Sequence, residues 1–211
     1  MMLSRRCAAC GTAGEDLCHR CRFSLASVGA LCSPDGIAAA FAFDGVAREL
    51  IVALKFRHRR SAAGALAGQM VRRLRLDHVD VVTWAPTSPR RVRRRGYDQA
   101  EAIARAVARQ LGVPCRRLLY RAHGAPQTGK SRSDRLIGPS FRARSPRQGL
   151  VVLIVDDVVT TGATLRTAAD ALRSAGVAHV EMAAAASAQL RHVQRRSPAT
   201  GTAPRIGHTG R

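Results

Sequence analysis

The stretch that decides the fold is VVLIVDDVVTTGAT, residues 151–164. It opens with an unbroken apolar run from Val151 to Val155, which is typical of a central parallel strand buried on both faces. Asp156 and Asp157 follow at once, and a small-residue loop then leads into residues 165–172, whose apolar positions have helical spacing. Carboxylates just after such a strand lie at the carboxyl edge of the sheet, where open α/β sheets bind ligands. The stretch therefore predicts an α/β fold with a ligand site at this edge.

The loop of this stretch carries groups that suit a phosphate. Thr160, Thr161 and Thr164 offer hydroxyls, and Gly162 allows the backbone to approach a ligand closely. The free N–H groups at the start of the following helix point into the same loop. The two carboxylates upstream can accept hydrogen bonds from vicinal hydroxyls, so a ribose 5-phosphate meets both demands. The alternative is an ordinary strand–turn–helix with a solvated acid pair, and the agreement of motif and context argues against it.

The same run resembles the 5-phosphoribosyl-1-pyrophosphate (PRPP) signature of type I phosphoribosyltransferases. It shows four apolar residues, two acids, two apolar residues and Thr-Thr-Gly-x-Thr. The resemblance implies the type I phosphoribosyltransferase fold, a mostly parallel twisted sheet flanked by helices. It assigns the ribose hydroxyls to Asp156 and Asp157. It assigns the 5′-phosphate to Val159, Thr160, Thr161, Gly162, Ala163 and Thr164. Magnesium is implied as a companion of the substrate, because a pyrophosphate leaving group needs its charge neutralised, and no all-protein magnesium cage is expected.

A second loop is expected to bind the pyrophosphate. Type I members carry it on a short loop after an earlier strand, and Ala85–Ser88 after the β-branched run Val79–Trp84 occupies the matching place. Five arginines between positions 90 and 95 predict a mobile cationic segment able to fold over a polyphosphate, with a solvated charge run as the alternative. The predicted pyrophosphate ligands are Pro86, Thr87, Ser88, Lys55 and Arg95. For Lys55, a surface lysine is an equally good interpretation.

A narrower resemblance lies downstream of this loop. The run Arg95-Gly96-Tyr97-Asp98-Gln99-Ala100 is similar to the ComF competence-protein family, as is a Gln127-Thr128-Gly129 element followed by spaced arginines and Phe141. The similarity covers roughly residues 5–186. The chain departs from the family at Asp98, where Asn is usual, and at Lys130 and Gly138, where Leu and Asn are usual.

Two Cys-x-x-Cys pairs stand near the start of the chain, Cys7 with Cys10 and Cys18 with Cys21. Four thiolates at this spacing can close a tetrahedral zinc site. A closed site has no open position for chemistry, so the zinc is expected to be structural. A metal-free or disulfide-paired segment is the alternative. ComF-like proteins resemble this pattern too, since they commonly carry an N-terminal four-cysteine finger.

The pattern divides the chain into three parts. We expect a small zinc-finger-like module at 1–35, a phosphoribosyltransferase-like domain at 36–189 and a disordered basic tail at 190–211. The helix at 98–111 is the best marked, because Asp98 and Glu101 resemble a capping box and Gly112 follows its end. Other helices are expected near 46–54 and 66–74, and strands at 37–43, 79–84, 150–155 and 177–185. The arginine-rich segment 116–147 is predicted to be partly irregular.

Charge and composition restrict the partners. The formal net charge is +21, with only 14 acids against 35 basic residues, all but two of which are arginine. Such a field attracts polyanions, although compositional bias of a genome would produce the same excess. No apolar run approaches the roughly 18–20 residues that span a bilayer, and charges occupy the first 25 residues, so we expect a cytoplasmic protein with no membrane span.

Two functions remain open at this point. The chain is either an enzyme that transfers the phosphoribosyl group of PRPP to an acceptor, or a competence factor that binds single-stranded DNA and uses the PRPP site for a ligand or signal. No residue is an obvious catalytic base, and aromatic residues are only 4% of the chain, which weakens the second reading because strand binders stack bases on aromatic rings. The sequence indicates neither the acceptor nor an oligomeric state.

Overall fold

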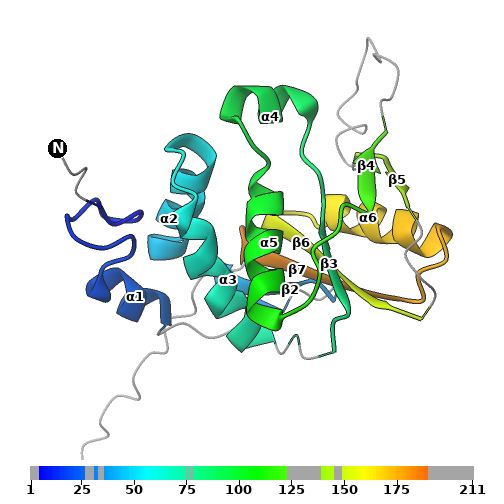
Figure 1. Ribbon diagram of the computed structural model, residues 1–211, viewed down its shortest axis with the longest axis horizontal. Coiled ribbons are helices and arrows are strands. Elements are labelled where there is room, and N and C mark those ends of the chain that lie inside the picture. Colours follow the sequence, from blue (N-terminus) through cyan, green and yellow to red (C-terminus); the bar gives the residue numbers. More distant parts are fainter. Residues whose placement is uncertain are drawn as a thin grey trace, which may run out of the picture.

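The sheet at the centre of the molecule has five strands in the order β1-β2-β7-β6-β3 (Figure 1). The computed structural model describes residues 5–26, 31–32, 36–74, 76, 78–122, 139–144 and 149–189, with residues 31–32 as backbone only. The strands are β1 (Leu31–Cys32), β2 (Ala38–Ala42), β3 (Val81–Trp84), β6 (Val151–Val159) and β7 (His179–Ser187). All neighbouring pairs are parallel except β1 with β2. The predicted mostly parallel sheet is confirmed.

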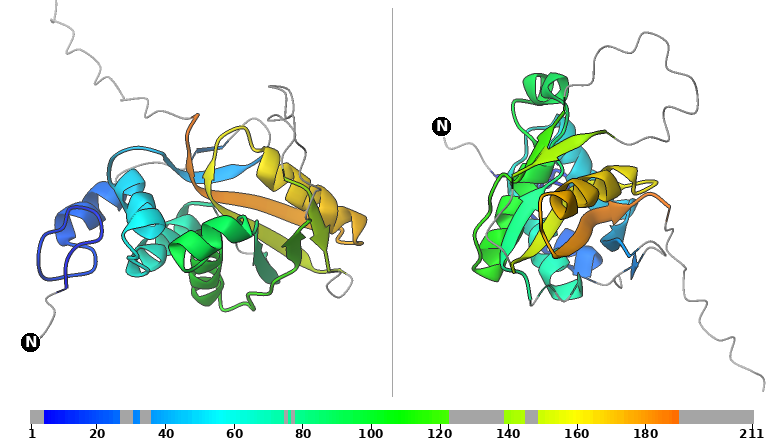
Figure 2. Two further views of the ribbon diagram at one scale, coloured as in Figure 1. Left: turned by 90° about the horizontal axis from the view of Figure 1, so that it is seen from above. Right: turned by 90° about the vertical axis from the view of Figure 1, so that its right-hand side faces the viewer.

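Helices cover both faces of this sheet, and the alternation of side chains in β6 explains why. Leu153 and Val155 join the core beneath α2 (Gly45–Phe56), α3 (Ser61–Leu74) and α5 (Gln99–Leu111). Val152 and Ile154 join the core beneath α6 (Ala163–Ser174). Strand neighbours point to opposite faces, so an unbroken apolar run fits only a strand covered on both sides. Figure 2 shows the sheet between these two layers.

The cysteine-rich module, residues 5–26, is attached to this core. It consists of two tight turns and the helix α1 (His19–Ala26), whose Leu25 side chain is buried. Arg73 of α3 donates hydrogen bonds to the carbonyl oxygens of Leu25, Ala26 and Ala40 at 2.7, 3.0 and 3.1 Å. Its guanidinium also lies 4.6 Å from the centre of the Phe41 ring. One arginine thus connects the end of α1 to strand β2.

Several predicted elements have the expected bounds. Helix α5 begins after Asp98, whose side chain accepts a hydrogen bond from Ala100 N, and it ends at Gly112 in the left-handed conformation. The segment 116–147 contributes an antiparallel pair, β4 (Leu119–Arg121) with β5 (Phe141–Ala143), to the face that carries α6. Positions 123–138 and 145–148, with Gln127, Lys130 and Gly138 among them, lie outside the described residues, as does the predicted tail 190–211.

Two features differ from the expectation. The arginine cluster forms the helix α4 (Pro89–Arg95), which is capped by Ser88, whose side chain accepts a hydrogen bond from Arg91 N, and which ends at Gly96. No residue of α4 is buried, so it has no apolar periodicity that would have indicated a helix. Strand β6 also does not end before the acid pair; it continues through Asp156 and Asp157 to Val159, where it still pairs with β7. No helix within the described ranges is long and apolar enough to cross a membrane.

Candidate PRPP site

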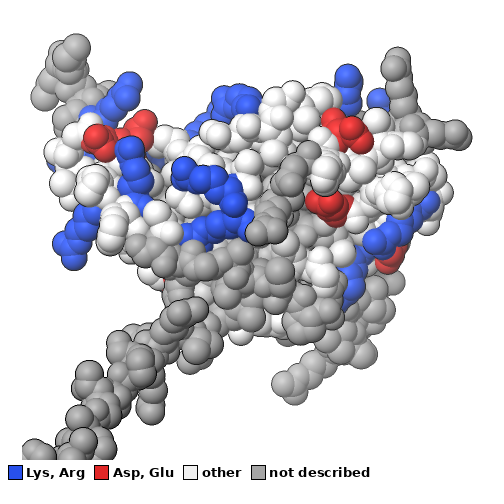
Figure 3. All heavy atoms as spheres, turned by 90° about the horizontal axis from the view of Figure 1, so that it is seen from below, with Lys and Arg blue, Asp and Glu red and all other residues white. Residues whose placement is uncertain are grey.

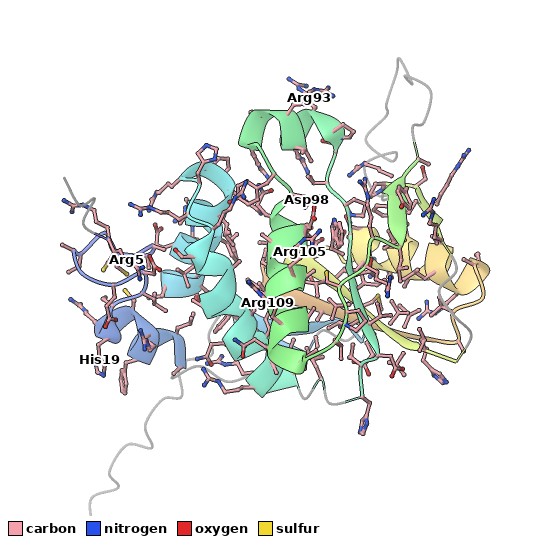
Figure 4. All side chains as sticks on the ribbon, viewed as in Figure 1. Arg5, His19, Arg93, Asp98, Arg105 and Arg109 are labelled. Atoms are coloured by element: carbon pink, nitrogen blue, oxygen red, sulfur yellow. The ribbon has the colours of Figure 1, made fainter. Side chains whose placement is uncertain are left out.

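A cavity of about 480 Å³ opens at the carboxyl edge of the sheet. Its walls come from the end of β6, the loops after β3 and β6, helix α2, helix α4 and strand β4. This is the edge where parallel α/β sheets place their ligands. Figure 4 shows one side of the region, where Asp98 at the start of α5 lies below α4 with its labelled Arg93. The size is within the range of small-molecule sites.

The acid pair predicted to hold ribose lies in this cavity. Asp157 makes an ion pair with Lys55 of α2, with 3.0 Å between Oδ1 and Nζ, and both side chains are less than one-fifth exposed. Asp156 accepts a hydrogen bond from the N–H of Asp157 at 2.7 Å. Burial and the neighbouring Asp157 carboxylate raise the pKa of Asp156 well above its ordinary value. The Asp156 carboxylate is therefore unfavourable in its ionised form here, and a positively polarised or hydroxyl-bearing ligand would stabilise it.

The loop predicted to hold the 5′-phosphate follows directly. Gly162 is the N-cap of α6 with φ +76° and has no side chain to cap the helix, while Ala163 N donates to Thr161 Oγ1 at 3.4 Å. A Cβ at this position would lie 2.6 Å from Ile37 Cδ1 and 2.7 Å from Arg166 Nη1. The first N–H groups of α6 have no carbonyl partners within the helix, and they point toward the loop that Thr160 and Thr164 bring to the cavity. Arg166 donates a hydrogen bond to Thr161 O at 2.7 Å, which holds the loop against α6.

The loop after β3 also reaches the cavity, and Asp98 holds it. The Thr87 N–H donates to Asp98 Oδ2 at 2.8 Å, while Ala100 N donates to Oδ1 at 3.0 Å. Asp98 is buried, and burial raises the pKa of its carboxyl despite these N–H groups. The carboxylate thus joins the predicted pyrophosphate loop to the start of α5. Pro86 and Thr87 line the cavity; Ser88 instead caps α4.

Cationic side chains face the acid pair from other elements. Arg95 of α4 donates to Gln99 Oε1 at 2.7 Å and stacks 5.3 Å from the exposed Phe56 ring, but its buried Nε has no hydrogen-bond partner among the described residues. Arg121 of β4 also lines the cavity. Burial, together with repulsion from Arg91, lowers the pKa of both guanidinium groups, and an anionic ligand would reverse that. Arg121 was not predicted, because it lies in no recognisable motif. The capping-box pattern predicted that Asp98 begins α5, but it did not indicate the second contact of its carboxylate, with Thr87 N.

The four predicted zinc ligands converge as their spacing indicates. The Sγ atoms of Cys7, Cys10, Cys18 and Cys21 all lie within 4.8 Å of one another. Hydrogen bonding with Thr12 lowers the pKa of Cys10 to about 6, so this thiol ionises readily, as a metal ligand must. The cluster does not include His19, which is exposed on α1 (Figure 4). The module can therefore bind a metal with four sulfur ligands.

Comparison with known proteins agrees with this geometry. Residues 98–203 match the family described as phosphoribosyl transferase domain. The chain is 33% identical over 144 residues to the DNA utilization protein YhgH of Salmonella typhimurium, and 32% identical over 95 residues to the competence protein ComFC of Bacillus subtilis. The matched region covers 63% of this chain and 63% of the Salmonella protein, and 44% of this chain and 38% of ComFC.

Two solved structures overlap with the chain more loosely. Glutamine PRPP amidotransferase from B. subtilis, complexed with ADP and GMP, has a TM-score of 0.44 at 24% identity over 60% of this chain and 26% of its own. Orotate phosphoribosyltransferase from Aeropyrum pernix has a TM-score of 0.38 at 17% identity over 81% of this chain and 93% of its own.

The fold, the motif and the matched domain define the class: this is a protein with a type I phosphoribosyltransferase domain. The chain therefore belongs to the phosphoribosyl transferase domain family. Its curated relatives, a DNA utilization protein and a competence protein, together with the N-terminal cysteine cluster, support the resemblance to the ComF family.

Proposed function

We propose that this protein binds PRPP with Mg²⁺ in the cavity at the carboxyl edge of the sheet and transfers the phosphoribosyl group to an acceptor. One observation carries the proposal. The acid pair, Lys55, Arg95 and the start of α6 all face one cavity, although they come from separate elements. A PRPP site requires three kinds of group: hydrogen-bond acceptors for the ribose hydroxyls, hydrogen-bond donors for the 5′-phosphate, and cations for the pyrophosphate.

Each part of PRPP can be assigned to a group of residues in or beside the cavity. Residues 159–164 and the start of α6 would bind the 5′-phosphate, and Asp156 with Asp157 would accept hydrogen bonds from the ribose hydroxyls. Lys55, Arg95 and the loop Pro86–Ser88 would face the pyrophosphate, and the unpartnered Nε of Arg95 is a donor that a phosphate oxygen would satisfy. Lys55 then has two partners, since it also neutralises Asp157.

Magnesium fits this arrangement as a companion of the substrate. Apart from the four cysteines, the described residues contain no cluster of three or more side-chain metal ligands. The ion would be held chiefly by pyrophosphate oxygens and water, with Asp156 or Asp157 within reach, and would neutralise the leaving group. The C1–O bond to pyrophosphate breaks as the acceptor's lone pair forms the new bond to C1. The carboxylates below the ribose favour the positive charge that develops on the ring.

The test is calorimetry with PRPP and Mg²⁺ on the wild-type chain and on Asp156→Ala with Asp157→Ala. We expect the double variant to lose measurable binding while it keeps the wild-type circular dichroism spectrum. The matched control, Asp170→Ala with Glu181→Ala, removes two exposed carboxylates from elsewhere and should bind as the wild type does. Unchanged PRPP affinity in the acid-pair variant would overturn the assignment.

A second function is favoured by the names of the relatives, a DNA utilization protein and a competence protein. In this function the chain binds single-stranded DNA, and PRPP is a ligand or signal. The charge of +21 supports polyanion binding. Figure 3 shows Lys and Arg side chains at several points of one face, with Asp and Glu side chains beside some of them.

Pyrophosphate release separates the two functions. If the protein is a transferase, we expect pyrophosphate to be released from PRPP when the correct nucleobase or other acceptor is supplied. A DNA titration at several salt concentrations measures the alternative function. If no acceptor gives turnover and DNA binds tightly with a steep dependence on salt, the competence function is favoured over the transferase.

A further inference from the structure

A second concave surface lies outside the PRPP cavity, between helices α3 and α5. This α3–α5 groove is open and has a volume of about 540 Å³. Its floor is made of small apolar side chains, Ala63, Ala102, Ala108 and Val113. Arg60, Tyr97, Arg105 and Arg109 form its sides. Figure 4 shows Arg105 and Arg109 one turn apart on α5, farther along the helix than Asp98.

The charges in the α3–α5 groove do not cancel. Glu101 is paired with Arg105 at 2.7 Å, and both oxygens of Asp98 accept backbone N–H groups. Arg109 has no ion-pair partner among the residues that the structure describes, and Arg60 is exposed with only the Tyr97 ring beside it. The lining thus carries three guanidinium groups against two carboxylates, and two of the guanidinium groups, Arg60 and Arg109, have no ion-pair partner among the described residues.

The groove also offers a stacking surface. Arg60 lies 4.7 Å from the centre of the Tyr97 ring, whose hydroxyl is anchored to the Leu54 carbonyl oxygen. A fixed tyrosine with a planar guanidinium above it extends a flat surface over the apolar floor. Planar rings stack on such surfaces, and guanidinium groups bind phosphate through paired hydrogen bonds. A ligand that uses both features has a flat ring and a phosphate.

We propose that the α3–α5 groove binds a nucleotide unit, with its base over the apolar floor and its phosphate at the unpaired Arg109 and at Nη1 of Arg105, whose Nε and Nη2 pair with Glu101. The unit is either a free nucleoside monophosphate or one residue of a single strand, because both present the same chemistry. The site is separate from the PRPP cavity. Among the residues that the structure describes, Asp98 alone borders both, and neither the acid pair nor Lys55 lines the groove.

The test uses the full-length, zinc-loaded chain and calorimetric titration with AMP, inorganic phosphate and an oligodeoxynucleotide. We expect AMP to bind at least about tenfold more tightly than phosphate, because only AMP contacts the floor. Arg105→Gln with Arg109→Gln should weaken AMP binding by about tenfold or more. The matched control is Arg142→Gln with Arg173→Gln, which removes two exposed arginines from the far side of the sheet and should change the affinity less than about twofold.

A second variant separates the shape of the groove from its charge. Ala102→Leu fills the floor on a half-exposed helical position and leaves every charge in place. We expect it to weaken AMP binding about as much as the arginine pair does, with an unchanged Tm. AMP should also slow alkylation of Cys115, which lines the groove and whose pKa burial raises to about 11, and peptide mass spectrometry would locate that protection.

The outcomes test the proposal and show whether the nucleotide unit is free or part of a strand. Tight AMP binding supports a free nucleotide, whereas binding only by the oligonucleotide, lost in both groove variants, supports a unit within a strand. If Ala102→Leu has no effect, or if groove and control arginines weaken binding equally, the protein's general positive field is responsible and the proposal fails. Failure of PRPP binding leaves this test intact, because the Asp156→Ala with Asp157→Ala variant should still bind at the groove.

Discussion

The cysteine-rich module and the candidate PRPP cavity are two candidate binding regions built in opposite ways. The module takes its four sulfur ligands from positions 7 to 21, a short local stretch. The cavity takes its walls from α2, α4, β4 and β6, so Lys55 meets Asp157 across a hundred positions of sequence. A local site depends on its metal to hold it together, and a distributed site depends on the packing of the core. Each region should therefore fail for a different reason.

Metal removal should produce the largest difference between the two regions. Structural zinc contributes about 10–16 kcal/mol of apparent binding free energy in zinc-finger peptides, far more than so small a module could recover from its own core. We expect chelation, or Cys18→Ser, to unfold residues 5–26 while PRPP binding stays within about twofold of wild type. Zinc content and protease protection, followed by mass spectrometry, measure this. The control variant Cys115→Ser should keep its zinc. If residues 5–26 stay protected from proteolysis after the metal is removed, the structural role of the zinc is contradicted.

Arg73→Met should separate the module from the core with its zinc still bound. The variant removes a charged donor from three carbonyl oxygens and is expected to cost about 3 kcal/mol in the free energy of unfolding, measured with urea. The neighbouring Arg72 is exposed, so Arg72→Met is the matched control and should cost less than about 0.5 kcal/mol. Equal losses in both variants would show that the contacts of Arg73 do not hold the module.

Gly162→Ala should damage the cavity through its backbone. The left-handed φ of +76° costs a side chain about 1–2 kcal/mol, and the new Cβ would push against the buried Ile37 and against Arg166. Gly176, at the other end of α6, has φ +89° and open space around it. Gly176→Ala should thus lose similar stability in thermal unfolding and keep PRPP affinity, whereas Gly162→Ala should lose both. Wild-type PRPP affinity in Gly162→Ala would argue against the phosphate loop.

Asp156→Asn should have the smallest effect on stability. Unlike the variants above, it should stabilise the protein at high pH. The folded-state pKa of Asp156 is raised, so the ionised carboxylate destabilises the fold above that pKa, and the penalty disappears as pH falls toward the unfolded value. We expect the variant to raise Tm at pH 8 by about 2–4 °C, with the gain lost near pH 4, while PRPP affinity decreases. Asp170→Asn on the surface of α6 should show neither change. A lowered Tm at pH 8 would contradict the cause given for this pKa.

Elements with local signals were predictable. The apolar run of β6 identified a buried strand, and Asp98 with Gly112 marked both ends of α5, because caps and buried runs depend on neighbouring residues in the chain. Helix α4 was missed since its seven residues bury nothing; Ser88, Pro89 and Gly96 were its only signals. Strand β6 runs past the acids because pairing with β7, a long-range contact, extends it to Val159.

The sequence by itself determined the class of fold and the cluster of four thiols, and it indicated the acid pair and the candidate phosphate loop, because all of these follow from residue types at short spacing. Only the tertiary structure decided which distant groups meet them. It brought Lys55 to Asp157, placed Arg121 above the cavity and directed the Asp98 carboxylate to the Thr87 amide. The α3–α5 groove likewise exists only once two helices pack side by side. Spacing along a chain specifies local geometry, whereas contacts between distant residues depend on how the layers pack on the sheet.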